Sequence, residues 1–364
     1  MKKTNTLKKN FIQNSLLSRR INLIFLKKYK EIVYKILSTI NKPDFSYHVL
    51  SKNYKFNFSR KELEKFKKYQ NIVLVGMGGS ILGIKAICQF LQKKIKKNIY
   101  FFDNVDQNKI LNLKNELNFN KSLFIIISKS GNTIETLSNL LFLKILKKNK
   151  QNVILISEKQ NNSINMIAKK FNLFHVEHKN FIGGRFSVLS EVGIVPAYLM
   201  GLNIQELRKN FTKYLSISKN SFLMDSTLKL ANLLKKKKYK TLVFLNYSPE
   251  LKEFLYWCQQ LIAESLGKKN LGFMPVISNC PKDHHSLLQL YLDGPKDKIF
   301  YIFSLDQKKQ PKMKTKNILK ELKQLNSKSL DQIKNAQKNA VIKTLKKNKI
   351  PFREFLIQNK REET

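Results

Sequence analysis

The chain has 364 residues, of which 42% are hydrophobic and 11% aromatic, so it can bury a large core and is not a disordered protein. At roughly 150 residues per domain, this length predicts two domains. No apolar run reaches the roughly 18 residues of a membrane span, and the basic N-terminus lacks the cleavage site of a signal peptide. We therefore expect a cytoplasmic protein with no membrane partner, and the three cysteines, which lack metal-like spacing, agree with a reducing compartment.

The net charge is +44, from 69 basic and 25 acidic residues, and such a field attracts polyanions. Only seven of the basic residues are arginine, although arginine is the side chain that recognises phosphates and bases with paired hydrogen bonds. The lysines are spread over the whole chain, which favours compositional drift over a nucleic-acid function. We therefore expect no specific nucleic-acid partner, while an anionic small substrate would still be attracted.

To about residue 68 the sequence predicts helices, because apolar residues such as Phe11, Leu17, Ile21 and Ile24 recur at helical spacing. From there, short apolar runs alternate with amphipathic segments. Strands are predicted at 72–75, 99–102, 123–127, 153–156 and 174–176, and helices at 81–94, 133–147 and 163–170.

The second half repeats this alternation. Strands are predicted at 241–245, 273–276 and 299–303, and helices at 251–266 and 329–347. Strands that alternate with helices predict an α/β fold, in which parallel sheets are flanked by helices. We expect a helical N-terminal segment over 1–68, a first domain over 69–210 and a second domain over 211–364.

In doubly wound sheets, ligands bind at the carboxyl ends of the strands. The loop 76–80, Gly-Met-Gly-Gly-Ser, follows the first strand and opens a helix, where backbone N–H groups can face an anion. A dinucleotide site would need a third glycine where Ile81 stands, and Asp103 matches the ribose-binding acid only loosely. The loop alone is also compatible with a turn that binds nothing.

The turn 128–133, Ser-Lys-Ser-Gly-Asn-Thr, directly follows another predicted strand. Its hydroxyls, lysine and glycine form a compact phosphate cradle at a helix N-terminus. A helix cap needs only one hydroxyl, so three on one turn favour a ligand. The spacing is not that of a P-loop, which argues against a nucleoside triphosphatase.

A third loop, 183–187, contains Arg185 in Gly-Gly-Arg-Phe-Ser. In a chain that uses lysine almost everywhere, an arginine here indicates a need for its planar fork and permanent charge, although a surface ion pair is the simpler explanation.

Candidate acid–base groups lie later in the chain. Gln260 and Glu264 are four residues apart and share a helix face, and His284 and His285 follow Asp283. Adjacent histidines point apart, so we expect no metal site there.

Taken together, the segments 76–80, 128–136, 183–187, 260–268 and 283–290 resemble the glucose-6-phosphate isomerase family. The resemblance implies two sugar-isomerase (SIS) domains. It also implies an aldose–ketose isomerase that interconverts glucose 6-phosphate and fructose 6-phosphate, in glycolysis and gluconeogenesis, without a metal or a cofactor. In this family one active-site histidine comes from the neighbouring subunit, so the resemblance implies a homodimer with shared active sites.

The resemblance also implies a role for each matching residue. The substrate phosphate would be held by Ser128, Lys129, Ser130 and Thr133, with Gly79 and Ser80 near the sugar and Gln260 positioning it. Glu264 would move the proton between carbons 1 and 2 through a cis-enediolate, and Arg185 would stabilise the developing charge. His285 would assist ring opening, together with a lysine on the C-terminal helix. For that lysine we choose Lys338, with Lys343 as second choice.

The chain departs from the family pattern in its short length and in His284, where the family more often has glutamine. Two alternatives stay open. A dual phosphoglucose/phosphomannose isomerase usually carries a different histidine-and-glutamate signature, and activity on mannose 6-phosphate would identify it. A non-catalytic SIS module that senses a sugar phosphate would keep 128–133 but need not keep Glu264, Arg185 and His285 together.

Overall fold

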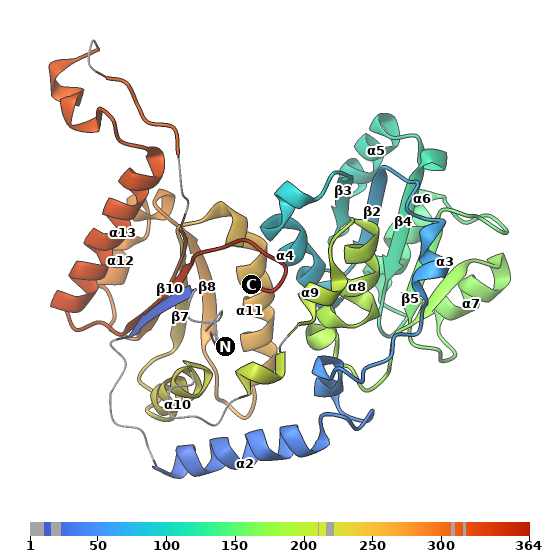
Figure 1. Cartoon of the computed structure of the whole chain (residues 1–364), viewed down its shortest axis with the longest axis horizontal. Helices are drawn as coiled ribbons and strands as arrows, with labels where there is room; N and C mark the ends of the chain where they lie inside the picture. The colour runs from blue at the N-terminus through green and yellow to red at the C-terminus, as the bar shows by residue number, and fades with distance from the viewer. Residues whose placement is uncertain (1–10, 16–22, 210, 216–221, 307–309, 316–317) are drawn as a thin grey trace, which may run out of the picture.

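The computed structural model describes residues 11–15, 23–209, 211–215, 222–306, 310–315 and 318–364. Two five-stranded sheets lie side by side, each with helices on both faces (Figure 1). This confirms the predicted α/β class, and each predicted strand has a counterpart. Within the described residues, no helix has the length and apolar character that a bilayer crossing requires.

The first sheet is entirely parallel, in the order β3-β2-β4-β5-β6. Its strands are β2 (Asn71–Gly76), β3 (Asn98–Phe102), β4 (Ser122–Ile127), β5 (Val153–Ser157) and β6 (Phe174–Glu177). One face carries α4 (Leu82–Phe90) and α8 (Glu191–Leu199), and the other carries α5 (Gln107–Glu116), α6 (Ile134–Leu143) and α7 (Ser163–Phe171). Because both faces are covered, β4 is apolar at every position after Ser122, and all of its residues are buried.

The second sheet has the order β1-β10-β9-β7-β8. Four of its strands are parallel: β7 (Thr241–Asn246), β8 (Met274–Asn279), β9 (Lys298–Leu305) and β10 (Phe352–Ile357). One face packs on α10 (Phe222–Lys235) and α11 (Lys252–Leu266), and the other on α12 (Leu288–Asp293) and α13 (Leu330–Lys347).

The N-terminal segment is not wholly helical, which corrects the prediction for 1–68. Residues Phe11–Ser15 form the strand β1, which pairs antiparallel with β10, so the N-terminal segment contributes a strand to the second sheet. The expected helical positions Leu17 and Ile21, like the expected domain boundary at residue 210, lie outside the described residues.

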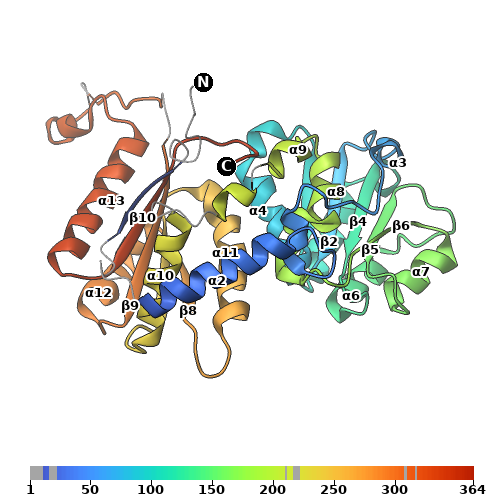
Figure 2. The ribbon, with the colours of Figure 1, turned by 60° about the horizontal axis from the view of Figure 1, so that its bottom comes forward.

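After β1 the chain crosses from the second sheet to the first. Helix α2 (Leu23–Thr39) packs on α10, and in both views it runs along one side of the molecule between the two halves (Figure 2). The short helix η1 (Ser46–Leu50) then reaches the loops of the first half, where Ser46 Oγ donates to the carbonyl of Phe181 at 2.5 Å. The short helix α3 (Arg60–Glu64) leads into β2.

The two halves meet through α4 and α11. Phe90 of α4 packs against the apolar cluster between α11 and the second sheet. Lys85, also on α4, pairs with Asp103 at 2.6 Å and with Glu253 of α11 at 3.1 Å. This contact places the C-terminal part of α11 beside the loops at the carboxyl edge of the first sheet.

Candidate active site

The candidate site begins where the strand order of the first sheet reverses. The neighbouring strands β2 and β4 end side by side, with Gly76 opposite Ile127. After β2 the chain returns to the sheet as β3 on one side of β2, and after β4 it returns as β5 on the other side of β4. Loops that follow such strands flank a crevice at the switch point. These loops are 76–80 and 128–133, so the structure places the two predicted anion-binding turns next to each other.

The turn 128–133 is an internally bonded cradle. Ser128 Oγ donates to Thr133 Oγ1 at 3.0 Å and accepts from the N–H of Gly131 at 3.1 Å. Ser130 Oγ lies 3.5 Å from Thr133 Oγ1. Gly131 has φ +69°, and a Cβ there would lie 1.9 Å from Asn162 Oδ1, so only glycine fits. Lys129 is held by the carbonyl of Asn180 at 3.0 Å, beside this turn.

The loop 76–80 packs directly on the loop that carries Arg185. A Cβ on Gly79 would lie 2.3 Å from the carbonyl carbon and oxygen of Gly184, so the two backbones touch. Ser187 Oγ joins them, because it lies 3.1 Å from the carbonyl of Gly79 and 2.7 Å from that of Gly184. Gly78 has φ +51° and leaves room for the Gln260 amide, which would be 3.0 Å from a Cβ there. Ser80 is buried and lies two residues before the first residue of α4.

Arg185 and Glu264 meet across the two halves. Arg185 Nη1 lies 3.4 Å from Glu264 Oε2, and Arg185 Nε donates to Ser265 Oγ at 2.9 Å. Gln260 Nε2 donates to Glu264 Oε1 at 2.8 Å, as expected for residues four apart on one helix face. The Glu264 side chain is 48% exposed to solvent, and the Arg185 side chain is 21% exposed. An ion pair this exposed adds only about 0–1 kcal/mol to stability, so the contact orients the carboxylate rather than holding the fold together.

Two partners of Arg185 were not predicted from the sequence. Trp257 Nε1 donates to the Arg185 carbonyl at 3.2 Å, and Ser265 holds the guanidinium. A signal for Trp257 was present, because it lies seven residues before Glu264 and therefore two turns away on the same side of α11. The guanidinium also lies 4.4 Å from the ring centre of Phe186.

Lys338 is not part of this site, and we withdraw it as a candidate. Its Nζ bonds Glu354 Oε1 at 2.8 Å and Ser304 Oγ at 3.1 Å, and the residue is buried. Helix α13 covers the face of the second sheet opposite to α11, so the sheet separates Lys338 from Glu264. Lys343, the second choice, is on the same helix and is exposed.

The two histidines lie in the short helix η8 (Lys282–His285), after β8. His284 Nε2 is 2.8 Å from Tyr247 Oη. Partial burial lowers the pKa of the His284 ring, and the neighbouring His285 lowers it further by a smaller amount. His285 is exposed, and the structure does not bring it to Glu264 within the described chain. Within the described residues, no group of three or more metal-binding side chains is present.

Comparison with known proteins points to one family. A family model described as phosphoglucose isomerase matches residues 50–273. The glucose-6-phosphate isomerase of Methanocaldococcus jannaschii is 39% identical over 246 residues, which are 65% of this chain and 61% of that protein. The Campylobacter jejuni enzyme of the same name is 35% identical over 271 residues, 67% of this chain and 63% of that protein. The chain thus spans about three fifths of the length of these relatives.

Solved structures share the fold at lower identity. A glucose-6-phosphate isomerase from Chlamydia trachomatis superposes with a TM-score of 0.74 at 19% identity, covering 98% of this chain and 80% of that one. A hypothetical protein, TT0462, from Thermus thermophilus gives a TM-score of 0.79 at 24% identity, covering 94% and 87%. Both therefore support the two-sheet arrangement.

Proposed function

This chain belongs to the phosphoglucose isomerase family, and from that premise we propose that it interconverts glucose 6-phosphate and fructose 6-phosphate in the cytoplasm. The observation that carries the proposal is the contact of Arg185 with Glu264 beside the glycine loop 76–80. A base, a fixed cation and a phosphate cradle from three distant parts of the sequence converge on one edge of the first sheet.

The cradle 128–133 suits the substrate phosphate. Its hydroxyls and the backbone at the start of α6 offer donors to an anion, and Ser130 is exposed to receive one. In this proposal Ser128, Ser130 and Thr133 bond the phosphate oxygens, and Lys129 supplies charge next to the turn. Gly79, Ser80 and Gln260 then face the sugar.

Glu264 is the group that we assign to proton transfer. One of its oxygens is fixed by Gln260 at 2.8 Å, while the other has only the longer contact to Arg185 and remains open to a substrate C–H. A carboxylate that takes the proton from one carbon can return it to the adjacent carbon through a cis-enediolate. Arg185, held by Ser265 and Trp257, then faces the negative charge that develops on the substrate oxygens.

His285 enters the proposal from a second copy of the chain. It is exposed on η8 and makes no contact with the Arg185–Glu264 pair of its own chain within the described residues. We propose a homodimer in which each chain supplies His285 to the active site of the other, where it assists ring opening. Such a two-fold arrangement builds two identical composite sites.

A coupled assay with fructose 6-phosphate tests the activity, and mannose 6-phosphate as an alternative substrate tests the dual specificity. Glu264→Gln should lower kcat by about 10²–10⁴-fold, the usual contribution of a general base, with KM changed by less than about threefold. Glu116→Gln, an exposed carboxylate at the end of α5, is the matched control and should keep full activity. Substantial turnover by Glu264→Gln would reject the assignment of the base.

Mixing two inactive variants tests the shared site. After subunit exchange, Glu264→Gln and His285→Ala chains should form mixed dimers with one intact site each, which restores about a quarter of the wild-type activity. Each variant incubated alone is the control. Failure to recover activity although exchange is demonstrated by mass spectrometry would show that His285 serves its own chain or none.

A further inference from the structure

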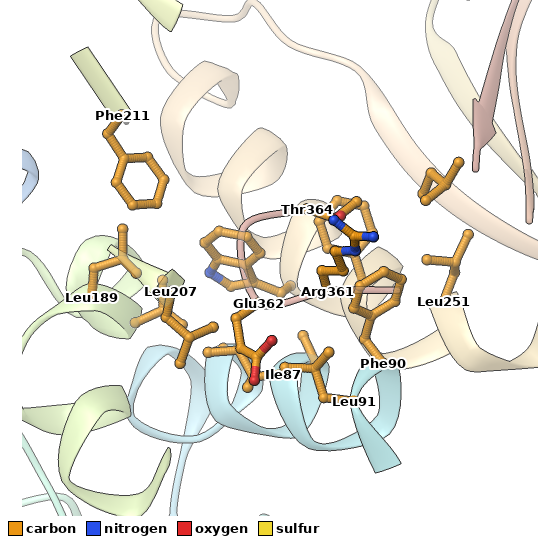
Figure 3. Close-up of a pocket in the computed structure, with 16 residues that line it drawn as sticks. Ile87, Phe90, Leu91, Leu189, Leu207, Phe211, Leu251, Arg361, Glu362 and Thr364 are labelled. Atoms are coloured by element: carbon orange, nitrogen blue, oxygen red, sulfur yellow. The ribbon is translucent and has the colours of Figure 1, made fainter. Parts of the chain in front are cut away.

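A second cavity lies between the two halves, next to the active site but separate from it. Its void is about 210 Å³, and Figure 3 shows the side chains that line it. Helix α4 contributes Ala86, Ile87 and Phe90, and the region of α11 contributes Leu251, Phe254 and Trp257. Trp257 lines this cavity and also donates to the Arg185 carbonyl, so it separates the two sites.

The lining defines what the cavity can hold. Aromatic side chains surround it, namely Phe90, Phe211, Phe254 and Trp257, and most of the other lining residues are aliphatic. An apolar cavity of about 150 Å³ takes up a benzene-sized molecule and excludes water, so about 210 Å³ has room for one ring with a short substituent. Aromatic walls pack best against a planar ring, in stacked or edge-on contact.

The segment 358–364 adds two charged side chains, Arg361 and Glu362, to this apolar lining. Within this segment Glu362 pairs with Lys94 of the first half, and Lys360 pairs with Glu250 at 3.0 Å. Arg361 lines the cavity and is an exposed residue, so a ligand in the cavity can reach its side chain (Figure 3). In the part of the chain that the structure describes, no carboxylate forms an ion pair with Arg361. Its planar fork suits a carboxylate supplied by a ligand.

We propose that this cavity binds a small aromatic carboxylic acid, with the ring between α4 and α11 and the carboxylate on Arg361. The ring fits the apolar walls and the volume, while the carboxylate fits Arg361, because the other charged lining residue, Glu362, is already paired with Lys94. The site shares only Trp257 with the proposed isomerase site, where Trp257 supports the Arg185 backbone, and it uses none of the residues that we expect to touch the sugar phosphate, so it can be tested independently of that proposal.

The single tryptophan of the chain makes this proposal directly testable, because Trp257 lines the cavity. Titration of the wild-type protein with phenylacetate should change the tryptophan fluorescence in a saturable manner, also in the presence of saturating fructose 6-phosphate. Acetate, which lacks the ring, should produce no change. A linear change without saturation, or loss of the signal with fructose 6-phosphate, would overturn the proposal.

Variants locate the binding. Ala86→Phe should fill the void and abolish the response, whereas Ala340→Phe, at an exposed position on α13, should leave it intact. Leu207→Phe, at another lining position, repeats the test if Ala86→Phe fails to fold.

A second pair of variants tests the charge. Arg361→Gln should raise the Kd for phenylacetate about fivefold, as expected for an exposed ion pair, and leave the Kd for toluene unchanged. Arg60→Gln, an exposed arginine in α3, should change neither. Equal affinity of the wild type and the filled variants would refute the site.

Discussion

At the scale of single residues, a buried histidine follows β6 near the phosphate cradle. His178 is 1% exposed, and neither ring nitrogen has a hydrogen-bond partner among the described residues. Burial, aided by the charge of Lys129, lowers the pKa of this ring to about 4 from an ordinary value of 6.5. The folded protein therefore contains a neutral imidazole that resists protonation.

This histidine makes the protein sensitive to acid. Since the pKa is lower in the folded state, stability is fully present above pH 6.5 and is lost as the pH falls toward 4. At about pH 5 the loss is roughly 2 kcal/mol, from about 1.5 pKa units. Urea unfolding at pH 7.5 and pH 5 should show a smaller pH-dependent loss for His178→Leu than for the wild type. Identical losses in the two proteins would mean that other groups cause the acid sensitivity.

A site residue could be predicted from the sequence when its residue type is rare in this chain, and could not be when its type is common. Arg185 is one of seven arginines among 69 basic residues, so its position carried information, and the structure places it against Glu264. Lys338 had no such signal, because lysine is abundant along the whole chain. Its partner Glu354 lies on a strand that was not predicted, so its buried ion pair could not be anticipated.

At the scale of elements, the contact between the loop 76–80 and the loop 183–187 requires that Gly79 has no side chain. Gly79 has no room for a Cβ, because one would overlap the Gly184 backbone at 2.3 Å, whereas a Cβ on Gly184 would meet nothing within 4 Å. The two glycines lie in contact but face different surroundings. They form a matched pair for substitution.

Gly79→Ala should destabilise the protein by about 1–3 kcal/mol, the range for overpacking, because the backbone of the Arg185 loop must move. The same movement should reduce kcat, since Arg185 follows Gly184 directly. Gly184→Ala should remain within about 0.5 kcal/mol of the wild type. Urea denaturation measures both, and equal effects of the two substitutions would contradict the close packing of the loops.

The strands were predictable to the extent that they are buried on both faces. Strands β2, β4 and β5 are continuous apolar runs. Strand β10 was missed because its sequence contains Arg353 and Glu354, which look like solvent-exposed residues. Both are instead paired inside the fold, Arg353 with Asp225 at 2.5 Å and Glu354 with Lys338 at 2.8 Å. Strand β1 was missed because its apolar residue Phe11 also fits a helical spacing, and only its pairing with a distant strand fixes it as extended.

At the scale of the whole molecule, the charge of +44 acts on any anion that approaches. A positive field raises the local concentration of a phosphorylated substrate, and salt screens it, with a Debye length of about 10 Å at 0.1 M. Raising the ionic strength from about 0.02 to about 0.2 M should therefore raise KM for fructose 6-phosphate several-fold and leave kcat within about twofold.

Two salts separate screening from ion binding. Potassium acetate and potassium chloride at equal ionic strength should act alike, because screening does not depend on the anion. A constant KM over this range would show that the lysines have no effect on substrate encounter. A much stronger effect of one anion would indicate occupation of the cradle 128–133 itself.

The pairing of β1 with β10 also decides the order in which the molecule can assemble. The first sheet is built from one contiguous stretch, residues 71–177, so all its strands are available once residue 177 has been made. The second cannot be finished then, because Phe11 must wait for Ile357. Strand β1 stays without its neighbour until residue 357 has been made, and closing so long a loop is slow. During that interval the backbone groups of Phe11–Ser15 lack the partners that β10 gives them in the finished sheet, and such an unpaired strand is open to wrong pairing.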